Sequence, residues 1–260
     1  MLALMPEDTE RIQQLKDDFV ERGGYWLPAL DALFRHAPDF AEDYIRFAAV
    51  PLDNDRLGPG LRALIQLAVS ASTTHLHGDA VRHHIRSALQ AGTTRAEIVE
   101  VLKLTSVLGI HTCTLGVPAL LEELQAFAAD GSDPAPLDAG RQALKDRFIA
   151  DRGYWNPVWD GILALDPVFF DAFTAFSANP WRTGPLPPKV KELVYIAIDT
   201  ATTHLFELGT HIHIARALRH GATRGEILEV LQLVSVLGIH TCALALPILD
   251  EELAAQARSA

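Results

Sequence analysis

The second half of this 260-residue chain repeats the first half at a constant distance of 129 residues. Residues 106–113 return unchanged as residues 235–242. Across residues 75–124, 29 of 50 positions are identical in the second half, without an insertion or a deletion. A repeat of this kind constrains the fold more than any other feature, because both halves must form the same structural unit.

The repeat predicts two tandem domains, residues 1–130 and residues 131–260. Their junction falls in residues 129–136, where Gly, Pro and Asp are typical of a linker. Hydrophobic residues make up 49% of the chain, which is enough to bury a core. The duplication therefore predicts two copies of one small domain.

Each copy is predicted to be all-α. Leu15 and Phe19 stand four residues apart, as one face of a helix requires, and no segment alternates as a strand would. Pro59 suits the first turn of a buried helix, and Gly92 suits the left-handed position that ends a later one. We therefore expect an all-helical fold in both copies.

A second helix boundary follows this glycine in each copy. Thr94 and Glu97, like Thr223 and Glu226, have the spacing of a capping box, in which a hydroxyl and a carboxylate satisfy free N–H groups at a helix start. Glu100 and its equivalent lie one turn further on. We expect that carboxylate to face solvent, with orientation of a histidine as the alternative.

The motif His84-x3-Ala-x3-Gly-Thr-Thr-x2-Glu-Ile-x-Glu, which recurs from His213 with Ala in place of the first Thr, resembles the signature of the carboxymuconolactone decarboxylase family. The resemblance covers residues 57–124 and 186–253, roughly half the chain. It implies an all-α fold and assembly into rings, so a two-copy chain is expected to form a trimer with pseudo-sixfold symmetry. It also implies a lyase or isomerase whose motif histidines act as acid–base groups on a small carboxylated substrate, lactone or aromatic-derived.

The alkylhydroperoxidase D branch of this family differs by two cysteines, seven and four residues before the motif histidine. Here His77 and Ala80 stand at those positions in the first copy, and Phe206 and Gly209 in the second. Peroxide reduction by a dithiol needs a thiolate and a resolving thiol. That mechanism is therefore not expected.

The chain has two cysteines, Cys113 and Cys242, at equivalent positions of the two copies. Neighbouring residues such as Leu115 and Leu244 predict that both thiols are small buried side chains rather than a disulfide. A peroxide-reducing or redox-sensing protein that uses these thiols is an alternative, and it requires them to be exposed and ionised.

Three histidines recur in both copies. The face that carries His84 also carries Ala88 and Gly92, so a polar imidazole there must find a partner or line a cavity. His75 lies nine residues earlier, which on one straight helix is about half a turn out of phase, so the two can share a pocket only if Thr73 and Thr74, just before His75, lie on a loop. The expected catalytic residues are His84, His213, His75 and His204. The expected substrate-binding residues are His77, Glu207, His111, His240, Thr74 and Thr203.

No cofactor is expected. The trio His204, Glu207 and His211 has ligand spacing on one helical face, but the first copy does not reproduce it, so metal binding is not predicted. A net charge of −11 argues against nucleic acid or an anionic membrane as partner, and leaves a small molecule or a protein. The resemblance implies that the partner is a small, anionic substrate. No signal or membrane segment is apparent, which predicts a cytoplasmic protein. A non-catalytic, ring-forming binding protein is the remaining alternative.

Overall fold

The computed structural model describes residues 6–127 and 137–259. These residues form helices and no strand, with 82% of the chain helical, so the all-α prediction is confirmed. Most of the expected linker, residues 129–136, lies outside the described residues. The helices of the first copy are α1 (Pro6–Glu21), η1 (Pro28–Asp31), α2 (Ala32–His36), α3 (Pro38–Asn54), α4 (Gly58–Ala71), α5 (Gly78–Gln90), α6 (Arg95–Ser106), η2 (Val107–Ile110) and α7 (His111–Ala126). Those of the second copy are α8 (Ala139–Arg152), α9 (Val158–Leu165), α10 (Pro167–Thr183), α11 (Pro188–Thr200), α12 (Glu207–Arg219), α13 (Arg224–Ser235), η3 (Val236–Ile239) and α14 (His240–Ser259).

The residues predicted to start or end helices lie at helix boundaries in the structure. Pro59 lies in the first turn of α4, and Gly92 has a φ of +85° directly after α5. Both capping boxes form, and at the start of α6 the Thr94 hydroxyl accepts from the N–H of Glu97 at 3.3 Å. Local chemistry therefore sets these boundaries in the same way in both copies.

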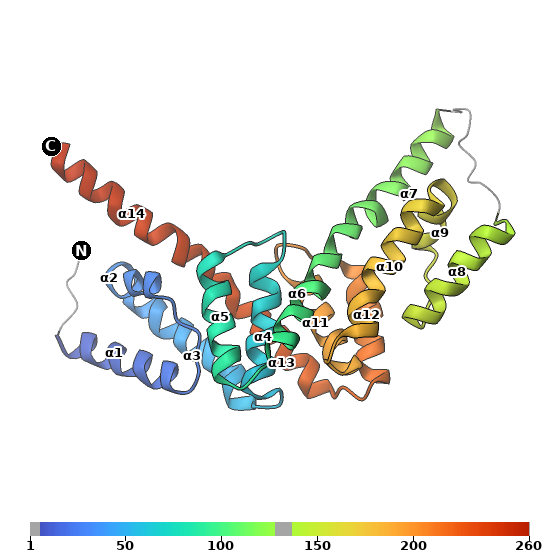
Figure 1. Cartoon of the computed structure of the whole chain (residues 1–260). Helices are drawn as coiled ribbons and strands as arrows, with labels where there is room; N and C mark the ends of the chain where they lie inside the picture. The colour runs from blue at the N-terminus through green and yellow to red at the C-terminus, as the bar shows by residue number, and fades with distance from the viewer. Residues whose placement is uncertain (1–5, 128–136, 260) are drawn as a thin grey trace.

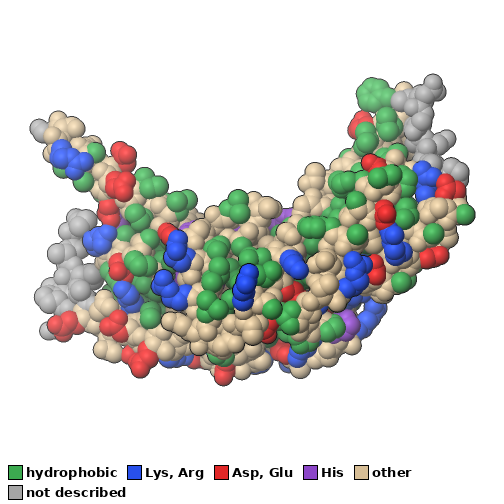
Figure 2. Space-filling view, in the orientation of Figure 1, with side chains coloured by type: hydrophobic (Ala, Val, Ile, Leu, Met, Phe, Trp, Pro, Cys, Tyr) green, Lys and Arg blue, Asp and Glu red, His purple; other side chains and the backbone are tan. Residues whose placement is uncertain are grey.

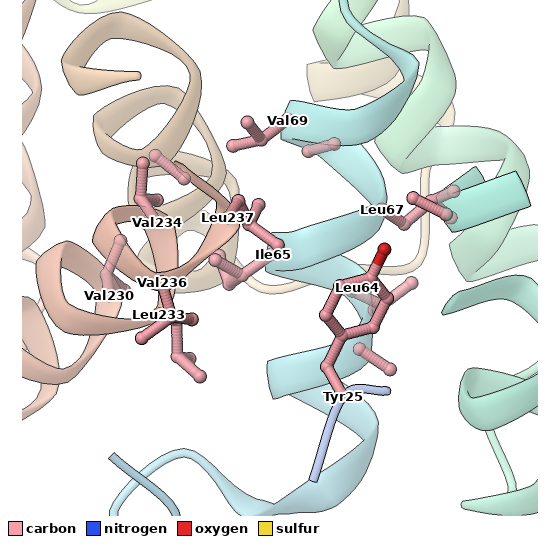
Figure 3. Close-up of a cluster of buried hydrophobic side chains, with 14 of the residues drawn as sticks. Tyr25, Leu64, Ile65, Leu67, Val69, Val230, Leu233, Val234, Val236 and Leu237 are labelled. Atoms are coloured by element: carbon pink, nitrogen blue, oxygen red, sulfur yellow. The ribbon is translucent and has the colours of Figure 1, made fainter. Parts of the chain in front are cut away.

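The core lies where α4 and α11, the central helices of the two copies, pack together and against the helices that follow them. In α4, Ile65 is fully buried because α13 of the other copy covers it. Figure 3 shows Ile65 on the side of α4 that faces Leu233 and Leu237. The two copies therefore share one continuous hydrophobic core.

The last helix of each copy reaches over to the other copy. Helix α7 packs against α9, and α14 packs against η1 and α2. In Figure 1 the green α7 lies beside the yellow helices of the second copy, and the red α14 extends toward the blue helices of the first. This exchange carries His111 and His240, the first residues of α7 and α14, into the opposite copy.

Glu100 and Glu229 hold the two copies together. Only 2% of Glu100 is exposed and none of Glu229, so the expectation that they face solvent is wrong. Glu100 accepts from the backbone N–H of Leu186 at 2.7 Å, and Glu229 accepts from that of Arg56 at 2.9 Å. Each carboxylate therefore satisfies a backbone donor of the other copy, just before its central helix.

Two helical stretches have the length and apolar composition of a membrane-crossing segment, residues 95–126 and residues 224–259. In their most apolar windows, 33% and 56% of the residues are buried inside the molecule. Core helices of soluble proteins can have the same length and apolar composition. Here the first stretch forms α6 and α7, and the second forms α13 and α14. Their composition is therefore weak evidence for a membrane.

Candidate functional site

The second copy contains a buried network of charged side chains around its motif histidine. Nδ1 of His213, on α12, lies 2.6 Å from a carboxylate oxygen of Glu192, on α11. Nε of Arg216, one turn further along α12, donates to the other oxygen of Glu192 at 2.6 Å. Glu192 is fully buried and His213 is 8% exposed. The carboxylate therefore fixes both the orientation of the ring and the nitrogen that points away from it.

A second carboxyl group, Asp199, lies on the other side of this ring. Its Oδ2 is 3.8 Å from Nε2 of His213, and neither of its oxygens has a hydrogen-bond partner among the described residues. Burial, with the nearby charge of Glu192, raises the pKa of Asp199 to about 8. Asp199 is therefore protonated at neutral pH.

A glycine makes room for Asp199. A Cβ on Gly209 would overlap Oδ2 of Asp199 and the ring of Phe206. In the first copy the equivalent residues are Ala80 and Ser70, so a shorter side chain faces an alanine. The glycine at one of the positions that carry cysteine in the alkylhydroperoxidase branch thus serves to accommodate a carboxyl group.

The surroundings favour a neutral imidazole on His213 and a protonated carboxyl group on Asp199, which face each other. Burial lowers the pKa of His213, although its hydrogen bond to Glu192 opposes that shift. Burial acts to raise the pKa of Glu192, but His213 and Arg216 outweigh it and the net shift is downward. A neutral imidazole beside a protonated carboxyl is the pairing expected of an acid–base site.

A small enclosed space of about 40 Å³ adjoins His213 and Asp199. Arg152 reaches it from the end of α8, is 6% exposed, and donates to the carbonyl oxygen of Ser177 at 2.7 Å. Tyr195, stacked on His213 with ring centroids 4.5 Å apart, lines it as well. The rest of the lining is mostly apolar, which strengthens electrostatic interactions inside it.

The exchanged helix α7 contributes His111 to this site. Nδ1 of His111 lies 2.6 Å from Nε2 of His204, and Phe206 stacks on the His111 ring. Ligand atoms of His111, His204 and Asp199 all lie within 4.8 Å of one another, a spacing that suits a metal ion. Two nitrogens bound to one tetrahedral zinc ion at 2.0–2.1 Å would stand roughly 3.3 Å apart, so a hydrogen-bonded pair explains the shorter distance better.

The first copy keeps the motif histidine without this network. Ala63 replaces Glu192, and Ser87 replaces Arg216. His84 is 1% exposed, stacks on Tyr25 at 4.7 Å between ring centroids, and has no hydrogen-bond partner for Nε2 among the described residues. Burial holds the pKa of His84 well below its ordinary value.

A chain of hydrogen bonds crosses from the second copy into the first. The hydroxyl of Tyr25 lies 2.6 Å from Nε2 of His240, and Nδ1 of His240 lies 2.6 Å from Nε2 of His75. The ring of His77 is 4.2 Å from that of His240, while its Nδ1 accepts from the N–H of Ala80 and so caps α5. Four of the six recurring histidines therefore meet in two pairs, His75 with His240 and His204 with His111, each built from both copies.

The other predicted site residues lie at the edge of these clusters. Thr74 and Thr203 are on the loops between helices, as a shared pocket required, and their hydroxyls face each other at 3.4 Å across the two copies. Both are exposed. The side chain of Glu207 is 91% exposed at the start of α12 and lies outside the buried network.

The prediction missed Glu192, Asp199, Arg152 and Arg216, none of which the first copy repeats. A signal was present in the sequence. Glu192 and Asp199 stand seven residues apart, on one face of a helix that is otherwise almost entirely apolar at its centre. Buried carboxylates in such a helix need partners, and that requirement marks them as candidates.

The two cysteines are free and half-buried. Leu115 and Leu244, which were expected to bury them, are 77% and 65% exposed, so that expectation is wrong. Cys113 packs at the edge of a cluster formed by Phe148 and its neighbours in the second copy, and Cys242 packs against the main core. The thiols lie in separate places, as a non-disulfide role requires.

Comparisons with known proteins agree with the resemblance in the motif. The pattern of the carboxymuconolactone decarboxylase family matches residues 38–129 and 167–251. A crystal structure from Burkholderia xenovorans LB400, provisionally named a gamma-carboxymuconolactone decarboxylase subunit, has 45% sequence identity and a TM-score of 0.88 over 96% of this chain and 98% of that one. No curated protein matches the chain. With more than half of its length matched in two tandem regions, this chain belongs to the carboxymuconolactone decarboxylase family.

Proposed function

We propose that this protein is a lyase or isomerase that uses acid–base chemistry on a small carboxylated lactone or related ring compound, and that the second copy carries out the reaction. The observation that carries this proposal is the buried hydrogen bond between Glu192 and His213, with protonated Asp199 facing the same ring. The name of the Burkholderia relative supports a carboxylated lactone as the substrate class.

In this proposal His213 and Asp199 share one proton and transfer it to the substrate. Glu192 holds the Nδ1 side of the imidazole, so Nε2 faces the enclosed space. The carbon–carbon bond between the substrate ring and its carboxylate breaks, and carbon dioxide leaves. The electron pair of that bond stays on the substrate, which becomes an enolate. The proton held by Asp199 and His213 then passes to carbon, and solvent restores it.

Other side chains of the site bind and orient. The guanidinium of Arg152 supplies positive charge to a substrate carboxylate. His111 of the first copy, which lines the space and is held by a hydrogen bond to His204, supplies a donor to the developing enolate oxygen. Because the space beside His213 is about 40 Å³, only the reacting group fits without movement, so a ring substrate must displace neighbouring side chains.

The test is carbon dioxide release from a panel of carboxylated lactones and hydroxy-aromatic acids. We expect His213→Ala to lower the rate by about 10²–10⁴-fold, the usual contribution of a general acid or base. His84→Ala is the matched variant in the first copy and should retain turnover. Turnover that survives His213→Ala, or that only His84→Ala abolishes, contradicts the assignment to the second copy.

We also propose that the chain assembles as a homotrimer with pseudo-sixfold symmetry. In support, α7 and α14 project from the body and expose apolar side chains (Figure 2), among them Leu120 at 49% and Ile248 at 50%. Such surfaces mark protein contacts more often than they remain in solvent. Light scattering that gives the mass of a single chain would contradict this assembly. A cytoplasmic location stays a prediction.

A further inference from the structure

We propose that the first copy holds a second ligand site, a cleft that binds a small aromatic or alicyclic carboxylate without transforming it. The cleft lies beside His84, between α4, α5 and the end of α1, and has a volume of about 350 Å³. Small-molecule sites in proteins commonly begin at about this size.

Smaller side chains create this cleft. Around His84 the first copy has Gly23, Leu52, Ala63, Gln66 and Ser87, where the second copy has Arg152, Trp181, Glu192, Tyr195 and Arg216. All five of the smaller residues line the cleft. Five reductions around one histidine leave a space that a single substitution would not.

The larger residues fill the same region of the second copy. The guanidinium of Arg152 lies 5.3 Å from the centre of the Trp181 ring, and that of Arg216 lies 5.0 Å from the centre of the Tyr154 ring. Trp181 and Tyr195 stack on each other. These rings and cations occupy the space that is open in the first copy.

The charge of the cleft selects an anion. Arg22, Arg62, His83 and His84 line it, and no Asp or Glu is among the described residues of its lining, although the chain as a whole carries a net charge of −11. Arg22 pairs with Asp53, and both side chains are about half exposed or more, so this ion pair is weak and a bound carboxylate can compete for its guanidinium group. Arg62 is largely buried, pairs with the exposed Asp55 at 2.9 Å and lies 3.9 Å from the buried Glu229, so it adds positive charge to one wall of the cleft.

His84 supplies the second observation. In the second copy Nδ1 of the equivalent His213 faces Glu192, and the counterpart of Glu192 is Ala63, which lines the cleft. Nδ1 of His84 therefore lies on the side of the cleft and has no hydrogen-bond partner among the described residues that a ligand would have to displace. Tyr25 stacks on the His84 ring and also lines the cleft. A ring compound in the cleft can therefore hydrogen-bond to Nδ1 of His84 and pack against Tyr25.

The same comparison explains why the ligand is not transformed. In the proposed reaction, proton transfer by His213 depends on Glu192 and Asp199. The first copy has Ala63 and Ser70 at those positions. Without either carboxyl group, His84 has no partner that would stabilise an imidazolium or restore its proton. The cleft therefore keeps the geometry for binding and lacks the acid–base pair.

Calorimetric titration of the full chain with benzoate tests this proposal, with benzamide as the uncharged analogue. We expect benzoate to bind at least tenfold more tightly than benzamide. Ala63→Glu, which restores the carboxylate of the second copy, should weaken benzoate at least tenfold by repulsion. Gln66→Tyr, which fills the space, should do the same. The control variant Glu207→Gln, on a side chain that is 91% exposed and outside both sites, should leave this binding event unchanged.

Three further measurements decide the outcome. Circular dichroism establishes that each variant folds, and the two cleft variants fail by different means, so one misfolded protein leaves the other as a test. The side-chain nitrogen signals of His84 should shift with benzoate in the parent chain. Equal binding of benzamide, unchanged affinity in both cleft variants, or loss of turnover in His84→Ala overturns the proposal. Loss of turnover in His213→Ala alone is the result expected from the proposed function, and it does not test binding in the cleft.

Discussion

The surroundings of His84 and His213 differ although the two histidines occupy the same place in the repeat. Around His213, Glu192 and Arg216 form a filled, charged and hydrogen-bonded network. Around His84 the equivalent residues are small or neutral and leave a cleft. The backbone and the helix boundaries are nearly the same in both. Side chains next to the motif histidine differ while the boundaries of the surrounding helices agree, which separates the requirements of the fold from those of the site.

The largest effect is expected from breaking the network at Glu192. Glu192→Ala leaves the buried His213 and the partly buried Arg216 without the carboxylate that pairs with both, and we expect the free energy of unfolding to fall by about 3–5 kcal/mol in urea titrations. Adding Arg216→Ser reproduces the pair found in the first copy, so the double variant should lose less than the sum of the single losses. Additive losses would show that the three residues do not act as one unit.

A pH-dependent effect is expected from Asp199. Its pKa is about 8 in the folded chain against an ordinary 3.8, so the folded state holds a proton that the unfolded state releases. This contribution to stability is complete below pH ~4 and is lost as the pH rises toward ~8. Asp199→Asn should therefore exceed the parent in stability by roughly 2–5 kcal/mol at pH 9 and match it near pH 4.

Thermal unfolding across this pH range measures the difference. The matched control is Glu207→Gln, since that side chain is 91% exposed. A constant difference between Asp199→Asn and the parent at all pH values would mean that Asp199 is ionised in the folded protein.

An intermediate effect is expected at the glycine that accommodates Asp199. Gly209→Ala forces a Cβ against the carboxyl group and should cost about 1–3 kcal/mol by overpacking. Combining it with Asp199→Ser recreates the Ala80 and Ser70 pair of the first copy and should recover part of the loss, because the ring of Phe206 also lies 2.5 Å from that Cβ. Chemical denaturation of the two single variants and the double variant gives the coupling; a coupling near zero contradicts the steric explanation.

The smallest effect is expected where the copies agree. Thr94→Ala and Thr223→Ala each remove one capping box and should each cost about 1 kcal/mol. Because the caps have the same geometry, the two losses should be equal within error in denaturant titrations. Unequal losses would mean that the divergence of the copies extends to helix boundaries.

The sequence alone determined the duplication, the all-α fold, the helix boundaries at Pro59 and Gly92, and both capping boxes. These features depend on residues close together in the chain, where backbone geometry and local hydrogen bonds decide the outcome. The motif histidines were also identified, because a polar side chain stands out on a face of small residues. The expectations for Glu100 and Leu115 were wrong, since their burial depends on which distant helix packs against them.

Only the tertiary structure decided what surrounds each histidine. The exchange of α7 and α14 places His111 and His240 in the opposite copy, and no local pattern encodes such a crossing. The pKa of Asp199 and the cleft beside His84 likewise arise from side chains that meet only after the copies pack. Periodicity records which face of a helix is buried. Which partner buries it, and with what charge, is fixed by packing between segments far apart in the chain.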